Sequence, residues 1–391
     1  MESARIVGAL ARYTGDFALA EDVAQDALAE ALVSWAVDGV PREPAGWLLT
    51  TGRRRAIDAF RRRAARDERY ALLARDLEHD VPGADSLFAP GAIDDDVLAL
   101  LFVACHPVLS KEARLALTLR VVGGLTTDEI ARAFLVPVAT IQARITRAKK
   151  TLAAAQVPFS VPEPADRPAR LGSVLQVIYL VFTEGSFATG GTEWMRVDLA
   201  GEALRLARQL VRLSPEPEVF GLLALLELGA ARFPARVGAD GRPVLLEDQD
   251  RRLWDRAAIR RGRAALERAG RPGLGFYGLQ AAIAECHAVA GSVAETDWDR
   301  IVILYEALAQ LAPSPVIDLN RAVAVAMASG PAAGLALVDA IDLPGHLVPS
   351  VRGELLLRLG RTEEAHAALR EAIALCTNPV EREALERKLS L

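Results

Sequence analysis

The sequence predicts an all-α protein, on two observations. Aromatic residues make up only 5% of the 391 residues, and the alternating β-branched runs that form strands are almost absent. Apolar residues instead recur at helical spacing along the chain, for example at Val23, Ala27, Ala31 and Trp35. We therefore expect helices throughout, around a core that the apolar fraction of 51% can supply.

Composition excludes several classes of protein. The formal net charge is −5, so no overall basicity indicates a nucleic-acid-binding chain. The three cysteines (Cys105, Cys286 and Cys376) are far apart and odd in number, which argues against a disulfide framework. There is no signal-peptide pattern at the N-terminus, and the longest apolar stretches are too short to span a membrane. We expect a cytoplasmic protein with no membrane partner.

Two breaks in composition divide the chain. Residues 76–110 contain seven acids and no Lys or Arg, which favours a loop or linker that becomes helical near Val97. Four prolines in residues 157–170 favour an extended connector. The predicted parts are residues 1–75, an acidic linker 76–96, residues 97–156, a Pro-rich connector 157–170, and residues 171–391.

The second part contains a predicted helix-turn-helix. Thr126 and Glu129 have the spacing of a capping box, so a helix should begin there and end near Pro137. A second helix follows, with Ile141, Ile145 and Ala148 on its buried side and a supporting helix upstream at residues 114–122. A plain helical hairpin is the alternative.

The second helix of this pair is basic, with no acid in residues 140–150. Arg can bind a guanine edge through two hydrogen bonds and Gln an adenine edge, whereas Lys more often contacts phosphate. A solvated helix face is the alternative explanation for such a tract. The predicted DNA contacts off the apolar stripe are Thr140, Gln142, Ala143, Arg144, Arg147, Lys149 and Lys150.

A different basic tract occupies residues 53–75, with nine arginines against three acids. Ile57 and Phe60 fall at helical spacing, with arginines on the other sides. Exposed bases stack on aromatic rings and phosphates need cations, so the tract suits single-stranded or melting DNA. Trp47, just upstream, is better explained as an anchor of packing than as a stacking platform.

Three segments in register give the chain a resemblance to a known family. Residues 15–26, 47–63 and 115–150 resemble, in order and spacing, regions 2 and 4 of bacterial RNA polymerase sigma factors of the extracytoplasmic-function subfamily. The match covers about 150 residues. Residues 94–107, together with the long helical extension, resemble the group whose tail contains tetratricopeptide-like repeats.

The resemblance implies partners and roles. Core RNA polymerase, through its β′ clamp and β flap, and promoter DNA would be the partners. The β′ contacts would be Asp22, Gln25, Asp26 and Ala29. The melted −10 element would lie on Trp47, Arg53, Arg54, Arg61 and Arg62, and the helix at residues 140–150 would contact the −35 element. Gly52 and Arg54 depart from the subfamily, which often has Ala and Asn there.

The acidic linker acquires a role from the same resemblance. A negatively charged strand could lie in the positively charged RNA channel of the polymerase as a mimic of nucleic acid. We therefore hypothesise that Asp94, Asp95 and Asp96 support holoenzyme assembly or initiation.

Residues 171–391 resemble a helical repeat. Prolines punctuate the helices at Pro217, Pro315 and Pro379, with separations near multiples of 33 residues, and residues 359–372 resemble the second helix of a tetratricopeptide repeat. Stacked helix pairs present a concave surface. We expect this part to bind a protein partner or to fold back on the sigma regions and regulate them.

No catalytic or metal-binding constellation stands out. The adjacent pairs Cys105–His106 and Cys286–His287 would point to different sides of a helix, so we interpret them as core residues. We expect no cofactor and no enzyme activity. The sequence predicts a sigma factor that directs initiation at −10 and −35 elements. A repeat-type interaction scaffold without promoter activity is the main alternative, and a hydrolase in the C-terminal half is a third.

Overall fold

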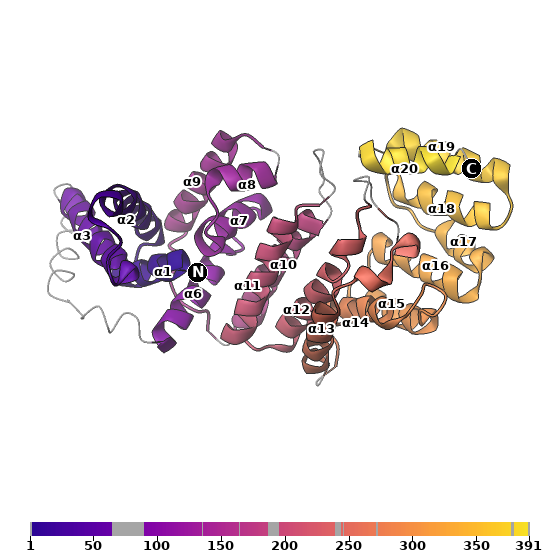
Figure 1. Cartoon of the computed structure of the whole chain (residues 1–391), viewed down its shortest axis with the longest axis horizontal. Coiled ribbons are helices and arrows are strands. Elements are labelled where there is room, and N and C mark those ends of the chain that lie inside the picture. The colour runs from indigo at the N-terminus through magenta and orange to yellow at the C-terminus, as the bar shows by residue number, and fades with distance from the viewer. Residues whose placement is uncertain are drawn as a thin grey trace. The chain divides into compact units, whose positions relative to one another are not determined.

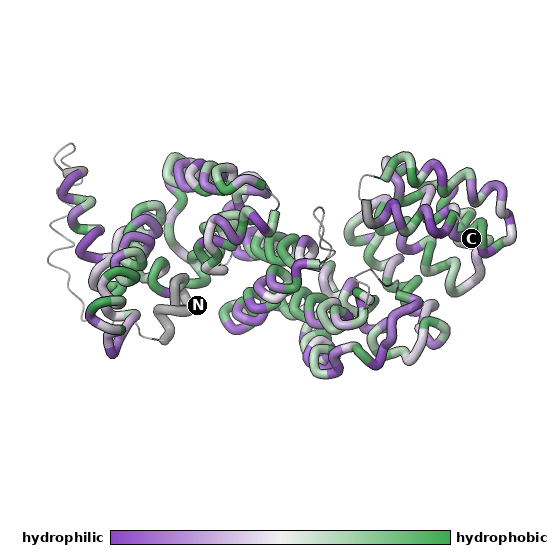
Figure 2. Tube along the Cα trace, turned by 45° about the horizontal axis from the view of Figure 1, so that its top comes forward, coloured by the Kyte–Doolittle hydropathy of each residue, from purple (hydrophilic) through white to green (hydrophobic). Residues whose placement is uncertain are grey.

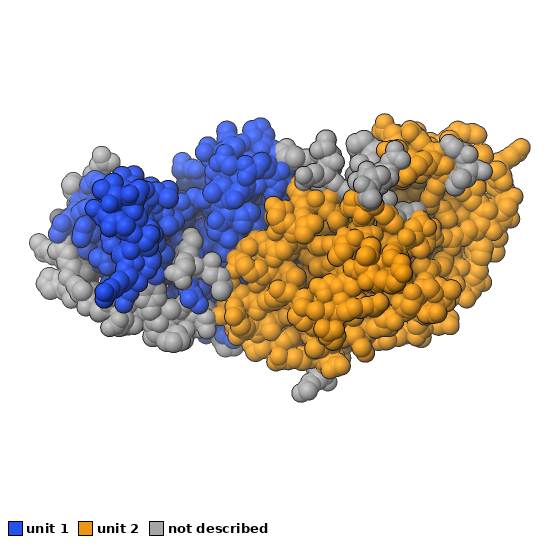
Figure 3. All heavy atoms as spheres, viewed as in Figure 1, with its two compact units in different colours: residues 1–181 blue, residues 182–391 orange. Residues whose placement is uncertain are grey.

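The computed structural model describes residues 2–64, 90–134, 136–163, 165–186, 195–238, 244, 246–270, 273–376 and 379–389. Within those ranges every regular element is a helix, which confirms the predicted all-α class (Figure 1). The chain divides into two compact units, residues 1–181 and 182–391, coloured separately in Figure 3. Hydrophobic and hydrophilic residues alternate along the helices in Figure 2, as expected for amphipathic helices that cover a core.

Three helices build the N-terminal bundle of the first unit: α1 (Glu2–Thr14), α2 (Phe17–Asp38) and α3 (Pro44–Ala64). Each of them packs against the other two. Asp16 caps α2 by accepting a hydrogen bond from the Leu19 N–H at 3.0 Å. Gly52 allows α3 to approach α1 closely, because a Cβ there would lie 2.8 Å from Cδ1 of Leu10.

The second half of this unit contains α6 (Pro90–Ala104), α7 (Lys111–Thr118), a π-helical turn η1 (Leu119–Gly123), α8 (Thr127–Ala133) and α9 (Val138–Ala154). Helix α6 packs on α1, and both α7 and α8 pack on α9. The single supporting helix expected at residues 114–122 is thus α7 followed by η1.

The acidic linker differs from expectation where the structure describes it. Helix α6 begins at Pro90 rather than near Val97, because proline suits the first turn of a helix. Asp96 is 4% exposed and pairs with Arg12 at 3.4 Å. It therefore belongs to the packed contact between α6 and α1, and not to a free acidic strand. The rest of the linker, apart from the backbone of residues 90–95, lies outside the described residues.

In the described residues of the expected connector, no helix precedes α10 (Arg167–Ser186). The first part of α10 packs on the first unit: Arg170 donates to the carbonyl of Phe102 at 2.9 Å, and Arg114 donates to Ser173 Oγ at 3.4 Å. The units consequently divide at residues 181 and 182, inside α10, and not at the prolines.

The second unit is a succession of helices that pack on their neighbours in sequence, which is the arrangement of a helical repeat. They are α11 (Val197–Leu213), α12 (Pro217–Ala230), α13 (Arg256–Ala269), α14 (Phe276–Val289), α15 (Trp298–Leu311), α16 (Pro315–Ser329), α17 (Pro331–Val338), α18 (Leu347–Arg358), α19 (Thr362–Leu375) and α20 (Pro379–Leu389). Helix α12 also packs extensively on α14, the next helix but one. Three short 3-10 turns lie between α12 and α13: η2 (Phe233–Ala235), η3 (Leu246–Asp248) and η4 (Arg251–Leu253).

The prolines that punctuate this part mark where helices begin. Pro217, Pro315 and Pro379 are the first residues of α12, α16 and α20. Proline is favoured there because its missing N–H would have no partner within the helix. No described helix is long and apolar enough to cross a lipid bilayer.

Candidate functional site

Helices α8 and α9 form a helix-turn-helix. The Glu129 N–H donates to Thr126 Oγ1 at 3.2 Å, and the Thr126 N–H donates to Glu129 Oε2 at 2.7 Å, so the predicted capping box is present. Helix α8 ends at Ala133, and α9 begins directly after Pro137. The buried face of α9 consists of Ile141, Ile145, Ala148 and Leu152.

Seven side chains of α9 are proposed to contact the −35 element, and six of them lie outside this buried face. In the described part of the chain, none of these six forms an ion pair with another helix. Gln142, Arg147 and Lys150 are exposed. Thr140, Ala143 and Arg144 are partly exposed. Together they give α9 a polar, cationic side that is accessible in the free protein.

Lys149 is the exception, because its ammonium group is paired with α2. It donates to Glu21 Oε2 and, at 2.7 Å, to Asp22 Oδ1, and its side chain is only 15% exposed. Burial by itself would lower the pKa of Lys149, but the two carboxylates outweigh it and raise that pKa above its ordinary value. Lys149 is therefore a charged link between α9 and α2.

Glu21 completes this link from the other side. Its carboxylate is almost fully buried, and its second oxygen lies 3.6 Å from Nε of Arg120 in η1. One buried anion on α2 is thus balanced by two cations from the helix-turn-helix half of the unit. We call Glu21, Asp22, Arg120 and Lys149 the α2–α9 ion cluster.

The described part of the arginine-rich tract, residues 53–64, lies on α3. Arg54, Arg61 and Arg62 are exposed, whereas Arg53 is partly buried with its guanidinium carbon 4.8 Å from the centre of the Tyr13 ring. Trp47 is half-buried and meets Trp35 edge-on, with ring centres 5.5 Å apart. This contact agrees with the interpretation of Trp47 as a packing anchor.

The predicted polymerase contacts share one face of α2. Asp22, Asp26 and Ala29 are exposed and Gln25 is partly exposed. Asp22 already pairs with Lys149, and Asp26 lies 3.4 Å from a guanidinium nitrogen of Arg55 on α3. The face is accessible, and part of its charge is neutralised within the protein.

An apolar patch on the same helix was not predicted. Four large side chains in and just after the last turns of α2 stand in solvent: Leu32, Val33, Val37 and Val40, with 80%, 72%, 83% and 67% of their surface exposed. The sequence could have indicated this patch, because residues 17–38 are apolar on more than one side of the helix. A helix that only covers a core has a polar outer side. Several large apolar side chains exposed within one short segment indicate an interaction surface.

Among the described residues, neither Cys–His pair belongs to a group of three or more potential metal ligands. Cys105 lies 3.2 Å from Thr118 Oγ1, and burial raises the pKa of its thiol to about 12. Cys286 is buried, and His287 meets Trp298 edge-on. In the described part of the chain, the side chains placed to hold an ion together are His346, Cys376 and Glu381. Sequence spacing did not suggest this group, since its members belong to three segments.

Comparisons with known families agree with the geometry of the first unit. Residues 2–66 match the Sigma-70 region 2 family, and residues 99–152 match the Sigma-70, region 4 family. Residues 170–270 match a family of unknown function, DUF6596. A tetratricopeptide repeat protein from Parabacteroides merdae superposes with a TM-score of 0.35 and 13% identity, covering 68% of this chain and 97% of that one.

Two relatives connect the chain to a family. An uncharacterized protein of Rhizobium meliloti (strain 1021) is 47% identical over 386 residues, which is 96% of this chain and 90% of that protein. The ECF RNA polymerase sigma factor SigK of Mycobacterium ulcerans is 30% identical over 155 residues, 38% of this chain and 78% of that protein. With both sigma regions in order, the chain belongs to the extracytoplasmic-function (ECF) RNA polymerase sigma factors, and it carries a C-terminal extension.

Proposed function

We propose that this sigma factor binds core RNA polymerase through α2 and directs initiation at promoters whose −35 element contacts α9 and whose melted −10 element contacts α3. The observation that carries the proposal is the capped helix-turn-helix, whose second helix presents a basic, accessible side next to a fully apolar buried one.

The side chains of α9 supply the chemistry for sequence recognition. Arg144 and Arg147 can each donate two hydrogen bonds to a guanine edge in the major groove, and Gln142 can bind an adenine edge. Lys150, near the end of the helix, is suited to a phosphate. On α3, the exposed Arg54, Arg61 and Arg62 suit the backbone of a melted strand.

The exposed apolar patch of α2 supports polymerase docking. Binding of a partner that removes Leu32, Val33, Val37 and Val40 from water is favoured by the hydrophobic effect. The acidic residues Asp22 and Asp26 lie N-terminal to it on the same helix, so a basic partner surface would meet an apolar centre and an acidic border.

The α2–α9 ion cluster supports a closed resting state. Asp22 and Lys149 are proposed contacts of two different partners, polymerase and DNA, yet they neutralise each other in the free protein. We infer that polymerase binding competes with Lys149 for α2, which frees Lys149 for DNA and allows α9 to move away from α2. Free protein would then have low affinity for promoters, which is useful because genomic DNA offers many competing sites.

Regulation by the C-terminal extension is part of the proposal. The test is a truncation, and its end point must respect the boundary inside α10. Removal of everything after Val157 would also remove the turns of α10 that contact Phe102 and Arg114 in the first unit. A chain that ends at Val181 keeps those contacts. A changed yield of promoter-dependent transcripts from this shortened chain would support regulation, and an unchanged yield would argue for an independent tail.

The decisive experiment is transcription by purified core enzyme with the full-length protein on fragmented genomic DNA. Sequencing the 5′ ends should give start sites that share two upstream motifs and disappear without the protein. A repeat-type scaffold would yield no protein-dependent start sites, and that result would reject the proposal.

A further inference from the structure

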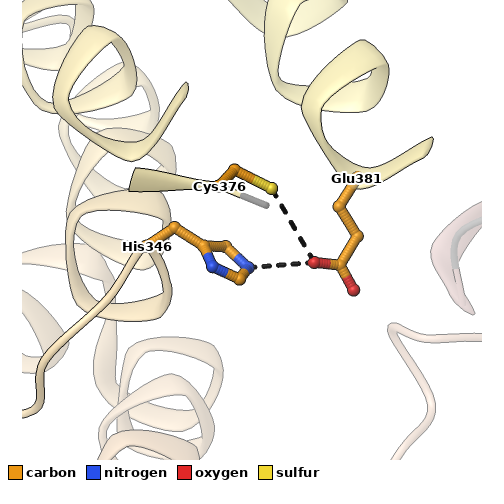
Figure 4. A group of neighbouring side chains, drawn as sticks. All are labelled: His346, Cys376 and Glu381. Carbon is orange, nitrogen blue, oxygen red and sulfur yellow. Dashed lines mark hydrogen bonds and ion pairs between the residues drawn. The ribbon is translucent and has the colours of Figure 1, made fainter. Parts of the chain in front are cut away.

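Three potential metal ligands from separate segments meet near the C-terminal end of the second unit (Figure 4). His346 precedes α18, Cys376 follows α19, and Glu381 lies in the first turn of α20. The Nε2 atom of His346 is 3.0 Å from Glu381 Oε2, and the Cys376 Sγ atom is 4.0 Å from the same oxygen. All three ligand atoms lie within 4.8 Å of one another.

These separations resemble one face of a tetrahedral zinc site. Zinc bonds of about 2.0–2.1 Å to nitrogen, about 2.0–2.2 Å to oxygen and about 2.3 Å to sulfur place neighbouring tetrahedral ligands roughly 3.3–3.6 Å apart. The two observed distances, 3.0 and 4.0 Å, lie on either side of that range. Small side-chain rotations would bring the three atoms around one ion.

The donor set favours one class of metal. A thiolate and an imidazole are typical ligands of zinc, and the hard ions Ca²⁺ and Mg²⁺ prefer all-oxygen sites. Binding is balanced by proton release, because the Cys376 thiol gives up its proton as the S–metal bond forms, and His346 binds through a neutral ring nitrogen.

The three ligands differ in how deeply they are buried. Cys376 is fully buried among Leu369, Ala372 and Leu385, whereas the side chains of His346 and Glu381 are 23% and 40% exposed. The backbone carbonyl of Cys376 accepts a hydrogen bond from Arg382. An ion would thus have His346 and Glu381 on its more exposed side and Cys376 on its buried side.

We propose that His346, Cys376 and Glu381 bind one Zn²⁺ ion, which joins the start of α18, the end of α19 and the start of α20. The ion would make attachment of the last helix to the repeat dependent on metal, because all three ligands lie at helix ends and no two on the same helix.

The test uses tag-free, full-length protein, stripped of metal and titrated with Co²⁺ as a spectroscopic replacement for Zn²⁺. We expect one Co²⁺ per chain, a thiolate-to-cobalt charge-transfer band, and visible bands of tetrahedral intensity that Zn²⁺ abolishes by displacement. Cys376→Ala should remove the charge-transfer band. Cys286→Ala, which alters a buried cysteine of the same unit, should keep it.

A surface variant keeps the test informative if Cys376→Ala unfolds. Glu381→Gln alters a partly exposed side chain and should weaken Co²⁺ binding at least tenfold while the circular dichroism stays native. Zn²⁺ should also slow hydrogen exchange in α20 of the natural protein. The absence of a thiolate band, or Co²⁺ binding that neither variant alters, would overturn the proposal and leave an ordinary His346–Glu381 ion pair.

Discussion

Lys149, in the helix proposed to contact the −35 element, is ion-paired with Glu21, a buried carboxylate on the helix proposed to dock on polymerase. The two residues are 128 positions apart in the chain. A buried acid held between two cations is a contact whose loss is costly, since removing one partner leaves the others without compensation. The contact therefore stabilises the packing of α9 against α2, which is the closed arrangement that we propose for regions 2 and 4.

Opening this contact should increase the affinity for core polymerase. Glu21→Gln leaves Arg120 and Lys149 without their shared anion, and a loss of about 1 kcal/mol from the closed state would raise apparent affinity roughly fivefold if closure competes with docking. The measurement is a titration of labelled protein with core enzyme. Glu30→Gln is the matched control, because Glu30 pairs with Arg55 inside region 2 alone. Equal affinities for all three proteins would show that closure does not compete.

Arg144 and Lys150 should differ in how their loss affects promoters. Arg144→Ala should cost about 1–3 kcal/mol at promoters with the preferred −35 sequence and relax the choice at one base pair, whereas Lys150→Ala should weaken all promoters alike and reduce the salt slope by about one. Holoenzyme binding to a set of −35 variants at several salt concentrations separates the two effects. A uniform loss with Arg144→Ala would argue against direct base recognition.

Charge placed in the apolar patch of α2 should impair docking without affecting folding. Val37 is 83% exposed, so Val37→Glu should change the free energy of unfolding by no more than about 0.5 kcal/mol. Its affinity for core enzyme should fall at least tenfold, because the glutamate would be buried against the partner. Ile303→Glu, in an exposed position of α15, is the matched control. Docking that is insensitive to Val37→Glu would remove the patch from the interface.

Acid should destabilise the second unit through His287. Burial, together with the nearby Arg232 and Arg251, lowers the pKa of His287 to about 4 from an ordinary value of 6.5. Between about pH 6.5 and pH 4, His287 is protonated in the unfolded chain but neutral in the folded state. The free energy of unfolding is therefore unaffected by this group above pH 6.5 and decreases as the pH falls from about 6.5 to 4.

Hydrogen exchange of amides in α14 measures this loss, with α3 of the first unit as the internal reference. His287→Gln should flatten the pH dependence in α14, since no group at that position then changes charge. A variant that keeps the full pH dependence would show that another group is responsible.

The amino-acid sequence determined the local structure. The capping box of Thr126 and Glu129, the break at Pro137 and the stripe of Ile141, Ile145 and Ala148 could be predicted, because each depends on residues a few positions apart. The all-α class followed from the same periodicity, whereas the two sigma regions were expected from the resemblance of three sequence segments to a known family. The start of α6 at Pro90 was missed, because the acidic composition of residues 76–110 favoured a loop, whereas proline suits the first residue of a helix.

Only the tertiary structure decided which distant side chains meet. The pairing of Lys149 with Glu21, the burial of Asp96 against Arg12 and the gathering of His346, Cys376 and Glu381 all join separate elements. So does the packing of the first part of α10 on the sigma regions, across the expected boundary. Helical periodicity shows which face of a helix is apolar, but the partner of that face is chosen by the packing of the whole chain.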